Sequence, residues 1–163
     1  MHSRVFWLVV ICVIGVLVFL FKRYKVPPNL QVEKLILTDE DGEEVPNPIE
    51  EKGVQVIVVW ATWCPPCIRE IPLLDEIINI YTNHDDVHFY MISDEDMIKQ
   101  KKFKEKKGFS MPLFRLESGS MHEIGVFSIP CTFIYKEGSV QFKKLGQWTS
   151  KKELIDTIEK ARK

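Results

Sequence analysis

Two cysteines with two residues between them, Cys64 and Cys67, are the residues in this sequence best suited to do chemistry. They lie in the segment WATWCPPC, where the apolar run from Val54 to Trp60 gives way to a stretch with helical periodicity. Such a pair can cycle between dithiol and disulfide, or it can supply half of a tetrahedral zinc site. A zinc site needs two more ligands, and only Cys131 and scattered histidines remain, so the sequence favours redox chemistry.

The residues around the pair predict a strand, a turn and a helix. Val54 to Trp60 is β-branched and almost continuously apolar, which is typical of a strand buried on both faces in a partly parallel sheet. Apolar residues then recur at three- and four-residue spacings from Pro65 to about Asn83, which predicts an amphipathic helix that Pro72 should kink. Both cysteines therefore fall at the start of that helix.

The start of the helix is expected to activate Cys64. If Cys64 is the N-cap, Pro65 and Pro66 occupy the first two helical positions, where a missing N–H costs little. The first available donor is then the N–H of Cys67, and this donor and the positive end of the helix favour a thiolate, so the pKa of Cys64 should be lowered. Cys64 is the predicted nucleophile, and the more buried Cys67 resolves the mixed disulfide.

Composition and length limit the remaining chemistry. The chain has 163 residues and a net charge of −1 from 22 basic and 23 acidic side chains, so nothing favours a nucleic-acid partner, which needs clustered positive charge. Its four cysteines are too few and too unevenly spread for a small fold held together by disulfides. Beyond its N-terminal segment, the chain is long enough for one compact domain.

The N-terminal segment predicts a membrane anchor. No charged residue occurs from Val5 to Phe21, which as a helix would extend about 25 Å, just enough to cross a bilayer. The run leads directly into Lys22 and Arg23, with no small residues for a cleavage site, so an uncleaved anchor fits better than a signal peptide. Cys12 lies inside the run as a small apolar residue. We assign residues 1–25 to the anchor, 26–29 to an extended proline-containing linker and 30–163 to the domain.

The other predicted elements complete one domain. A hairpin is expected at its start, a charged helix presents a solvated row of lysines, and a capping box at Ser150 begins a final helix. The remaining bounds are Leu30 to Leu37 with Glu43 to Val45 for the first hairpin, Val87 to Ser93 for a strand, Glu95 to Lys107 for the charged helix, and Thr132 to Tyr135 with Val140 to Leu145 for a second hairpin.

The segment Trp63-Cys-Pro-Pro-Cys67 followed by Ile68-Arg-Glu70-Ile-Pro72 resembles the membrane-anchored thioredoxin-like proteins of bacteria, of the TlpA, ResA and CcmG type. The pattern WCxxCxxExP is far more specific than CxxC alone. Over about residues 30 to 160, the resemblance implies an α/β thioredoxin fold: a central mixed sheet flanked by helices, with an N-terminal β-hairpin and one preceding transmembrane helix. It also implies a domain outside the cytoplasmic membrane, whereas the basic residues after the apolar run would, by charge alone, retain it inside.

The resemblance extends to Ile129-Pro130-Cys131-Thr132-Phe133, which looks like the cis-proline segment of the family. By that likeness Pro130 should be cis and face Cys64, and the backbone of Ile129 should pair with an extended substrate segment. The other expected substrate contacts are Trp63, Pro65 and Pro66.

Differences from relatives draw attention to Glu70 and Cys131. Thioredoxin carries a buried Asp six residues before its first active-site cysteine, and this chain has Val58 there. Glu70 is thus the remaining carboxylate able to lie beneath the pair and exchange a proton with Cys67, the alternative being an ordinary acid favoured by the helix dipole. Cys131 stands where relatives usually have Thr, and it is either a small buried residue or a third thiol that modulates the pair.

The resemblance implies a thiol-disulfide oxidoreductase that reduces protein disulfides outside the cytoplasmic membrane, in cytochrome c maturation or another envelope process. A membrane thiol-reductant donor would restore the dithiol, and the redox-active Cys64–Cys67 disulfide would need no metal or organic cofactor. A metal-binding or copper-delivery module on the same fold is the alternative, although such modules typically use CxxxC with a distant His. The sequence leaves the direction of electron flow open.

Overall fold

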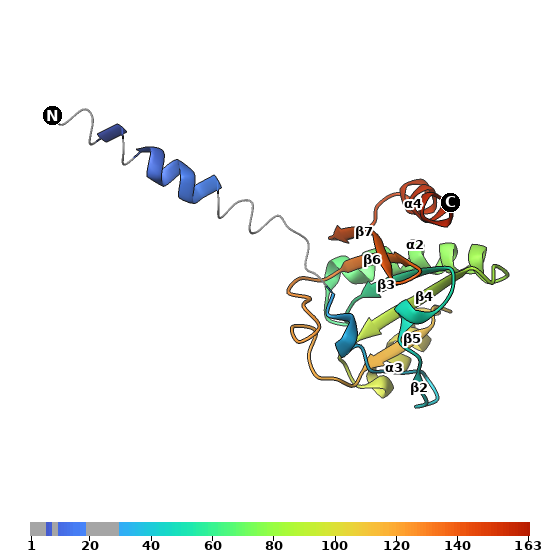
Figure 1. The fold of residues 1–163 in the computed structure, drawn as a ribbon. Helices are drawn as coiled ribbons and strands as arrows, with labels where there is room; N and C mark the ends of the chain where they lie inside the picture. Colours follow the sequence, from blue (N-terminus) through green and yellow to red (C-terminus); the bar gives the residue numbers. More distant parts are fainter. Residues whose placement is uncertain (1–5, 8–9, 19–29) are drawn as a thin grey trace.

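The computed structural model of the chain describes residues 6–7, 10–18 and 30–163. Residues 30–163 form a seven-stranded sheet with helices packed against it, in the strand order β2-β1-β5-β4-β3-β6-β7 (Figure 1). β3, β4 and β5 run parallel, and the other neighbouring strands pair antiparallel. The strands are Leu37–Thr38 (β1), Glu44–Val45 (β2), Val54–Val59 (β3), Val87–Ser93 (β4), Leu113–Leu116 (β5), Cys131–Lys136 (β6) and Ser139–Leu145 (β7).

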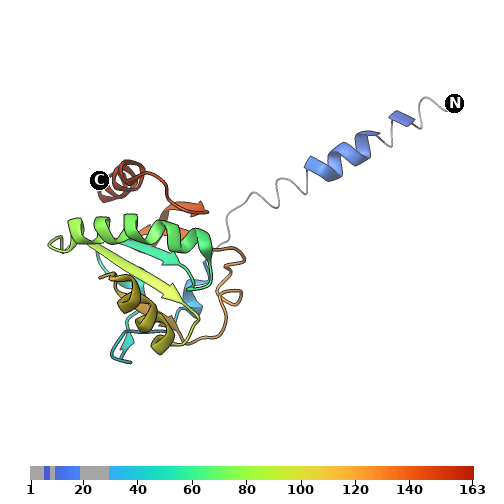
Figure 2. The ribbon, with the colours of Figure 1, turned by 180° about the vertical axis from the view of Figure 1, so that it is seen from behind.

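The α-helices of the domain are α2 (Pro65–Tyr81), α3 (Met97–Lys107) and α4 (Lys151–Arg162). α2 runs across the sheet with α4 beside it, which Figure 2 shows from behind, and α3 packs against β5. Local signals set several of these ends. The Oδ1 atom of Asp96 accepts the Ile98 N–H at 2.8 Å, Gly108 ends α3 in the left-handed region at φ 70°, and the hydroxyl of Ser150 accepts the Glu153 N–H at 3.2 Å.

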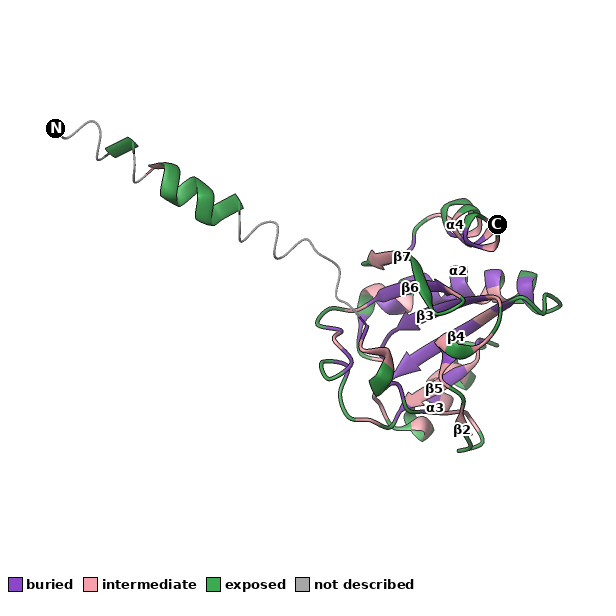
Figure 3. Cartoon of the chain, in the orientation of Figure 1, coloured by how far each residue is buried: buried purple, intermediate pink, exposed green. Residues whose placement is uncertain are grey.

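β3 lies at the centre of the core, as its apolar run predicts. Each of its residues is buried, and β4 and β6 on either side are buried along most of their length (Figure 3). Gly53 lets the chain enter this strand: it has φ +89°, and a Cβ there would lie 2.5 Å from the carbonyl oxygen of Asp86. β3 ends at Val59, and the turn that follows it leads directly to Cys64 at the start of α2.

The predicted strand from Leu30 to Leu37 is wrong for most of its length. A short 3-10 helix, η1 (Val32–Lys34), replaces it, and only Leu37 of the predicted run belongs to the two-residue strand β1. The backbone N–H of Gln31 donates to the Ile124 carbonyl at 2.8 Å, and the Asn47 side chain donates to the Val32 carbonyl at 2.7 Å. Because these bonds satisfy backbone groups outside a sheet, the segment has no need of a strand partner.

The N-terminal hairpin exists, but it is short and depends on an unpredicted strand. β1 pairs with β2 on one side and with β5 on the other, and β5 joins this hairpin to β4. A second 3-10 helix, η2 (Pro48–Glu50), leads from β2 toward β3. β5 has only four residues, LFRL, and its arginine interrupts the apolar residues. The segment is therefore too short and too mixed for its hydrophobic pattern to predict a strand.

Residues 10–18 of the predicted anchor are helical, and all but one of the large apolar side chains in this stretch are exposed. They are Ile11, Val13, Ile14, Val16, Leu17 and Val18. Among residues 6–7, 10–18 and 30–163, we find no helix both long and apolar enough to cross a membrane. The rest of the predicted anchor and the linker at residues 26–29 lie outside the described residues.

Candidate active site

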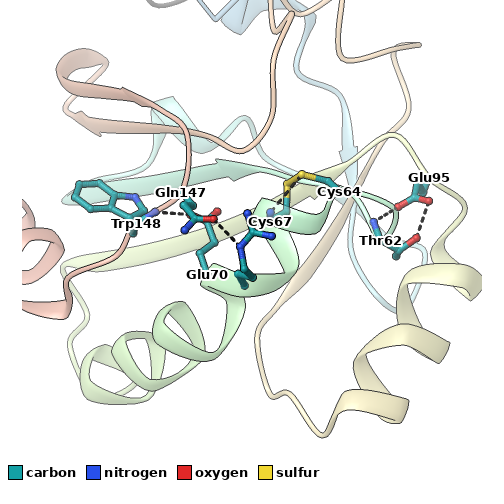
Figure 4. Close-up of a disulfide and its surroundings, with 8 residues drawn as sticks. Thr62, Cys64, Cys67, Glu70, Glu95, Gln147 and Trp148 are labelled. Atoms are coloured by element: carbon teal, nitrogen blue, oxygen red, sulfur yellow. Dashed lines mark hydrogen bonds between the residues drawn. A yellow bond between two sulfur atoms is a disulfide. The ribbon is translucent and has the colours of Figure 1, made fainter.

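The turn after β3 delivers Cys64 and Cys67 to the first turn of α2, where they form a disulfide with their Cα atoms 5.3 Å apart (Figure 4). Cys64 is the N-cap of the helix, and its sulfur accepts the N–H of Cys67 at 3.3 Å. Pro65 and Pro66 occupy the first two helical positions and have no backbone N–H, so neither can donate to the Cys64 sulfur. The predicted cap geometry is confirmed.

The two cysteines are both buried, and they differ slightly in exposure. Cys64 retains 4% of its surface and Cys67 none, so Cys67 is the more buried of the two, as predicted. Around Cys64, Trp63 is 64% exposed, Pro65 is exposed and Pro66 is half-buried. An incoming group therefore meets the Cys64 side of the disulfide first.

The segment before β6 lies at the same edge of the sheet as the cysteine turn. The Ile129–Pro130 peptide bond is cis, which confirms that prediction. Cys131 pairs with Val59, the last residue of β3, so the start of β6 lies beside the end of β3. Pro130 is buried and its carbonyl accepts the Gly146 N–H at 2.9 Å, while Ile129 is half-buried. The facing of Pro130 toward Cys64 stays a prediction.

Glu70 lies in α2 one turn after Cys67 and is 1% exposed. Its Oε2 atom accepts the backbone N–H of Trp148 at 2.7 Å, and its buried Oε1 atom has no hydrogen-bond partner. Burial raises the pKa of Glu70 to about 7, although the Trp148 N–H and the charge of Lys144 both act to lower it. Glu70 is thus a buried carboxyl with a raised pKa, unlike an ordinary solvated acid on a helix.

Cys131 is fully buried at the start of β6. Burial raises the pKa of its thiol to about 12; the charge of Glu70 acts in the same direction, and that of Lys143 acts against it. The thiol is therefore protonated at neutral pH. The charge of Glu70 therefore acts on the Cys131 thiol, and both groups are buried.

A hollow of about 400 Å³ opens beside Trp63, and sequence reasoning missed most of its lining. The loop between β5 and β6 supplies Met121, His122, Val126, Phe127 and Ile129 to its wall. Phe127 is 72% exposed and its ring lies 5.3 Å from that of His122. No periodicity marks this loop in the sequence, and the exposure of the Phe127 ring is visible only in the structure.

Metal ligation receives no support from the geometry. Across the described ranges, we find no group of three or more His, Cys, Asp or Glu side chains that could hold a metal ion. The metal-binding alternative therefore rests on the cysteine pair alone.

A family model described as Redoxin matches residues 24–152. The chain belongs to the Redoxin family. This redoxin is similar to the thiol-disulfide oxidoreductase ResA of Geobacillus thermodenitrificans, with 32% identity over 123 residues that cover 74% of this chain and 69% of the relative. ResA of Bacillus anthracis is 26% identical over 135 residues, which cover 80% of this chain and 77% of that protein. The TlpA, ResA and CcmG resemblance is confirmed.

Solved structures confirm the thioredoxin-like fold of this redoxin. StoA from Bacillus subtilis aligns with a TM-score of 0.63 and 22% identity, over 75% of this chain and 93% of that chain. A thiol:disulfide interchange protein from Chlorobium tepidum aligns with a TM-score of 0.64 and 19% identity, over 85% of this chain and 99% of that chain. Together with the ResA relatives and the Cys64–Cys67 pair, these findings identify this redoxin as a thiol-disulfide oxidoreductase.

Proposed function

We propose that this redoxin reduces disulfides of proteins on the outer side of the cytoplasmic membrane. Glu70 carries the proposal. A buried carboxylate one helical turn after Cys67 disfavours a thiolate near it, because two negative charges would then share a buried site. Strong oxidants of this fold owe their potential to a stabilised thiolate in the reduced form. Here Pro65 and Pro66 leave Cys64 a single N–H donor, from Cys67, so the thiolate of the reduced form is stabilised less than at a helix start that keeps all its donors.

The proposed cycle begins with the dithiol. The Cys64 thiolate attacks one sulfur of a partner disulfide, and the other sulfur leaves as a thiolate that takes a proton from solvent. Cys67 then passes its proton to the Glu70 carboxylate and attacks the Cys64 sulfur, which releases the second partner sulfur. Two electrons pass to the partner, and the Cys64–Cys67 disulfide forms. A pKa of about 7 suits Glu70 to both accepting and returning the proton.

The partner segment is proposed to lie between the cis-proline edge and the hollow beside Trp63. The backbone of Ile129 pairs with an extended stretch of the partner, and the rim formed by Trp63, Pro65, Pro66 and Pro130 surrounds the sulfur. Phe127 and Trp63, both largely exposed, receive an apolar side chain near the partner's cysteine.

The exposed apolar helix at residues 10–18 supports membrane anchoring, because such a surface is stable only when something covers it. We propose that residues 1–25 cross the membrane and hold the domain outside, where a membrane thiol-reductant donor restores the dithiol. Cytochrome c maturation is the envelope process that we propose, on the family resemblance, and the cycle uses no metal or organic cofactor.

A redox titration of the protein against glutathione and dithiothreitol tests the proposal, with Cys64→Ser and Cys67→Ser as controls. We expect one two-electron couple with a potential near that of thioredoxin, about −270 mV. Turnover of insulin disulfides should disappear in Cys64→Ser. A potential near about −120 mV, typical of a strong oxidant, would reverse the proposed direction, and the absence of a couple would remove the function.

A further inference from the structure

The segment Gly146-Gln147-Trp148, between β7 and α4, is hydrogen-bonded to three parts of the redox site. Gly146 donates its N–H to the Pro130 carbonyl at 2.9 Å, and the Gln147 side chain accepts from Arg69 of α2 at 3.2 Å. The backbone N–H of Trp148 donates to Glu70 Oε2 at 2.7 Å, the shortest of the three (Figure 4). One short loop therefore holds both the cis-proline segment and the buried carboxyl.

The side chain of Trp148 fixes this loop from the other side. It is 2% exposed, and its indole N–H donates to the hydroxyl of Thr132 at 2.9 Å. Its ring packs 5.8 Å from that of Phe142, and the Lys144 ammonium lies 4.2 Å from the ring centre. By contrast, the buried indole N–H of Trp60 has no partner, so the bond to Thr132 is not a general feature of buried tryptophans in this chain.

We propose that Trp148 is a positioning residue for the proton exchange at Glu70: the Thr132-bound indole fixes the backbone N–H that holds the carboxylate. Thr132 directly follows Cys131 and pairs with Val58 on β3, so it stands on the rigid centre of the sheet. The inference rests on the proposed function of Glu70, and it adds the two residues that determine where its hydrogen-bond donor lies.

The consequence follows from the chemistry of the carboxyl. An N–H donor binds the ionised form more strongly than the neutral form, so a misplaced donor leaves Glu70 protonated over a wider pH range. The other titratable groups facing it are Lys144 from β7, Cys131 from β6 and, in the reduced state, Cys67 from its own helix. None of these is a second hydrogen-bond donor to the carboxylate in the structure. A protonated Glu70 cannot accept the proton of Cys67.

The test is the titration of Glu70 in the oxidised full-length protein, followed by carbon NMR of labelled glutamate carboxyls, with Glu70→Gln assigning the signal. Thr132→Val removes the acceptor of the indole N–H, and Trp148→Phe removes the N–H itself. We expect either variant to move the titration midpoint upward by roughly 0.5 to 1 pH unit. The double variant should move it no further than the larger single shift, because both break the same bond.

Thr132→Ser is the matched control, because it keeps the hydroxyl and should titrate like the wild type. Unchanged midpoints in Thr132→Val and Trp148→Phe would overturn the inference, as would equal shifts in Thr132→Ser and Thr132→Val. The pH profile of insulin reduction distinguishes a failure of the positioning role of Trp148 from a failure of the proposed function of Glu70. If Glu70→Gln keeps the wild-type profile, the acid–base role of Glu70 fails even where the midpoints move.

Discussion

Glu95 accepts two hydrogen bonds from Thr62, one from its backbone N–H at 2.5 Å and one from its hydroxyl at 2.9 Å (Figure 4). Thr62 stands two residues before Cys64 in the turn after β3, and Glu95 lies just before α3. The Glu95 side chain is 8% exposed and also pairs with Lys99. A carboxylate from a different part of the sheet edge therefore fixes the turn that carries the disulfide.

Loss of this carboxylate should loosen the turn. We expect Glu95→Ala to lower the free energy of unfolding by about 2 kcal/mol, because hydrogen bonds to a charged group are worth roughly 1.5–3 kcal/mol each and part of this is recovered through water. Urea unfolding at pH 7 measures it. Lys99→Met is the matched control: the Lys99 side chain is 57% exposed, so its loss should cost under about 1 kcal/mol. Equal losses in both variants would contradict the role of the Thr62 bonds.

Glu70 should make the oxidised protein less stable as pH rises. Its pKa is raised from 4.5 to about 7, so the folded state holds the proton more tightly than the unfolded chain. The resulting stabilisation is complete below pH 4.5 and is lost as pH rises through about 7. Relative to Glu70→Gln, the wild type should lose about 3 kcal/mol of unfolding free energy between pH 4 and pH 9. Parallel pH curves of the two proteins in urea unfolding would show that the carboxyl is not perturbed.

The hollow beside Trp63 should matter for protein substrates and not for small disulfides. Phe127→Ala is expected to raise KM for insulin reduction several-fold while leaving turnover of glutathione disulfide unchanged, because an exposed ring at an interface contributes through contact with the partner. Ile98→Ala is the control, because it removes another large exposed side chain, 64% exposed, that lies on α3 away from the hollow. If both variants raise KM alike, the hollow has no special part in recognition.

Cys131 should be inert in the folded protein. Its thiol is fully buried and has a pKa of about 12, so iodoacetamide at pH 8 should label it at least about a thousandfold more slowly in the native oxidised protein than in urea. A Cys12→Ser background leaves Cys131 as the single free thiol to follow by mass spectrometry. Rapid native labelling, or a Cys64–Cys131 disulfide after partial reduction, would instead support the third-thiol interpretation.

The redox pair could be located from local sequence because its geometry depends on neighbours in the chain. The continuous apolar run of β3, the cap at Cys64 and the two prolines after it are local signals, and the same holds for the glycine that ends α3 and the serine that begins α4. Each of these signals is a local backbone preference that agrees with the conformation in the folded chain. The strand from Leu30 to Leu37 was predicted wrongly, because the Gln31 N–H bonds to the distant Ile124 carbonyl and the Asn47 side chain bonds to the Val32 carbonyl, so these backbone groups need no neighbouring strand.

Sequence alone thus determined that Cys64 begins a helix, that Cys67 lies one turn inside it and that Glu70 follows on the same helix. Only the tertiary structure decided what surrounds them. The donor to Glu70 comes from Trp148, 78 residues away, and it is a backbone N–H that every residue but proline possesses, so no side-chain pattern marks it. The raised pKa of Glu70 likewise depends on its burial, which arises only when the chain folds.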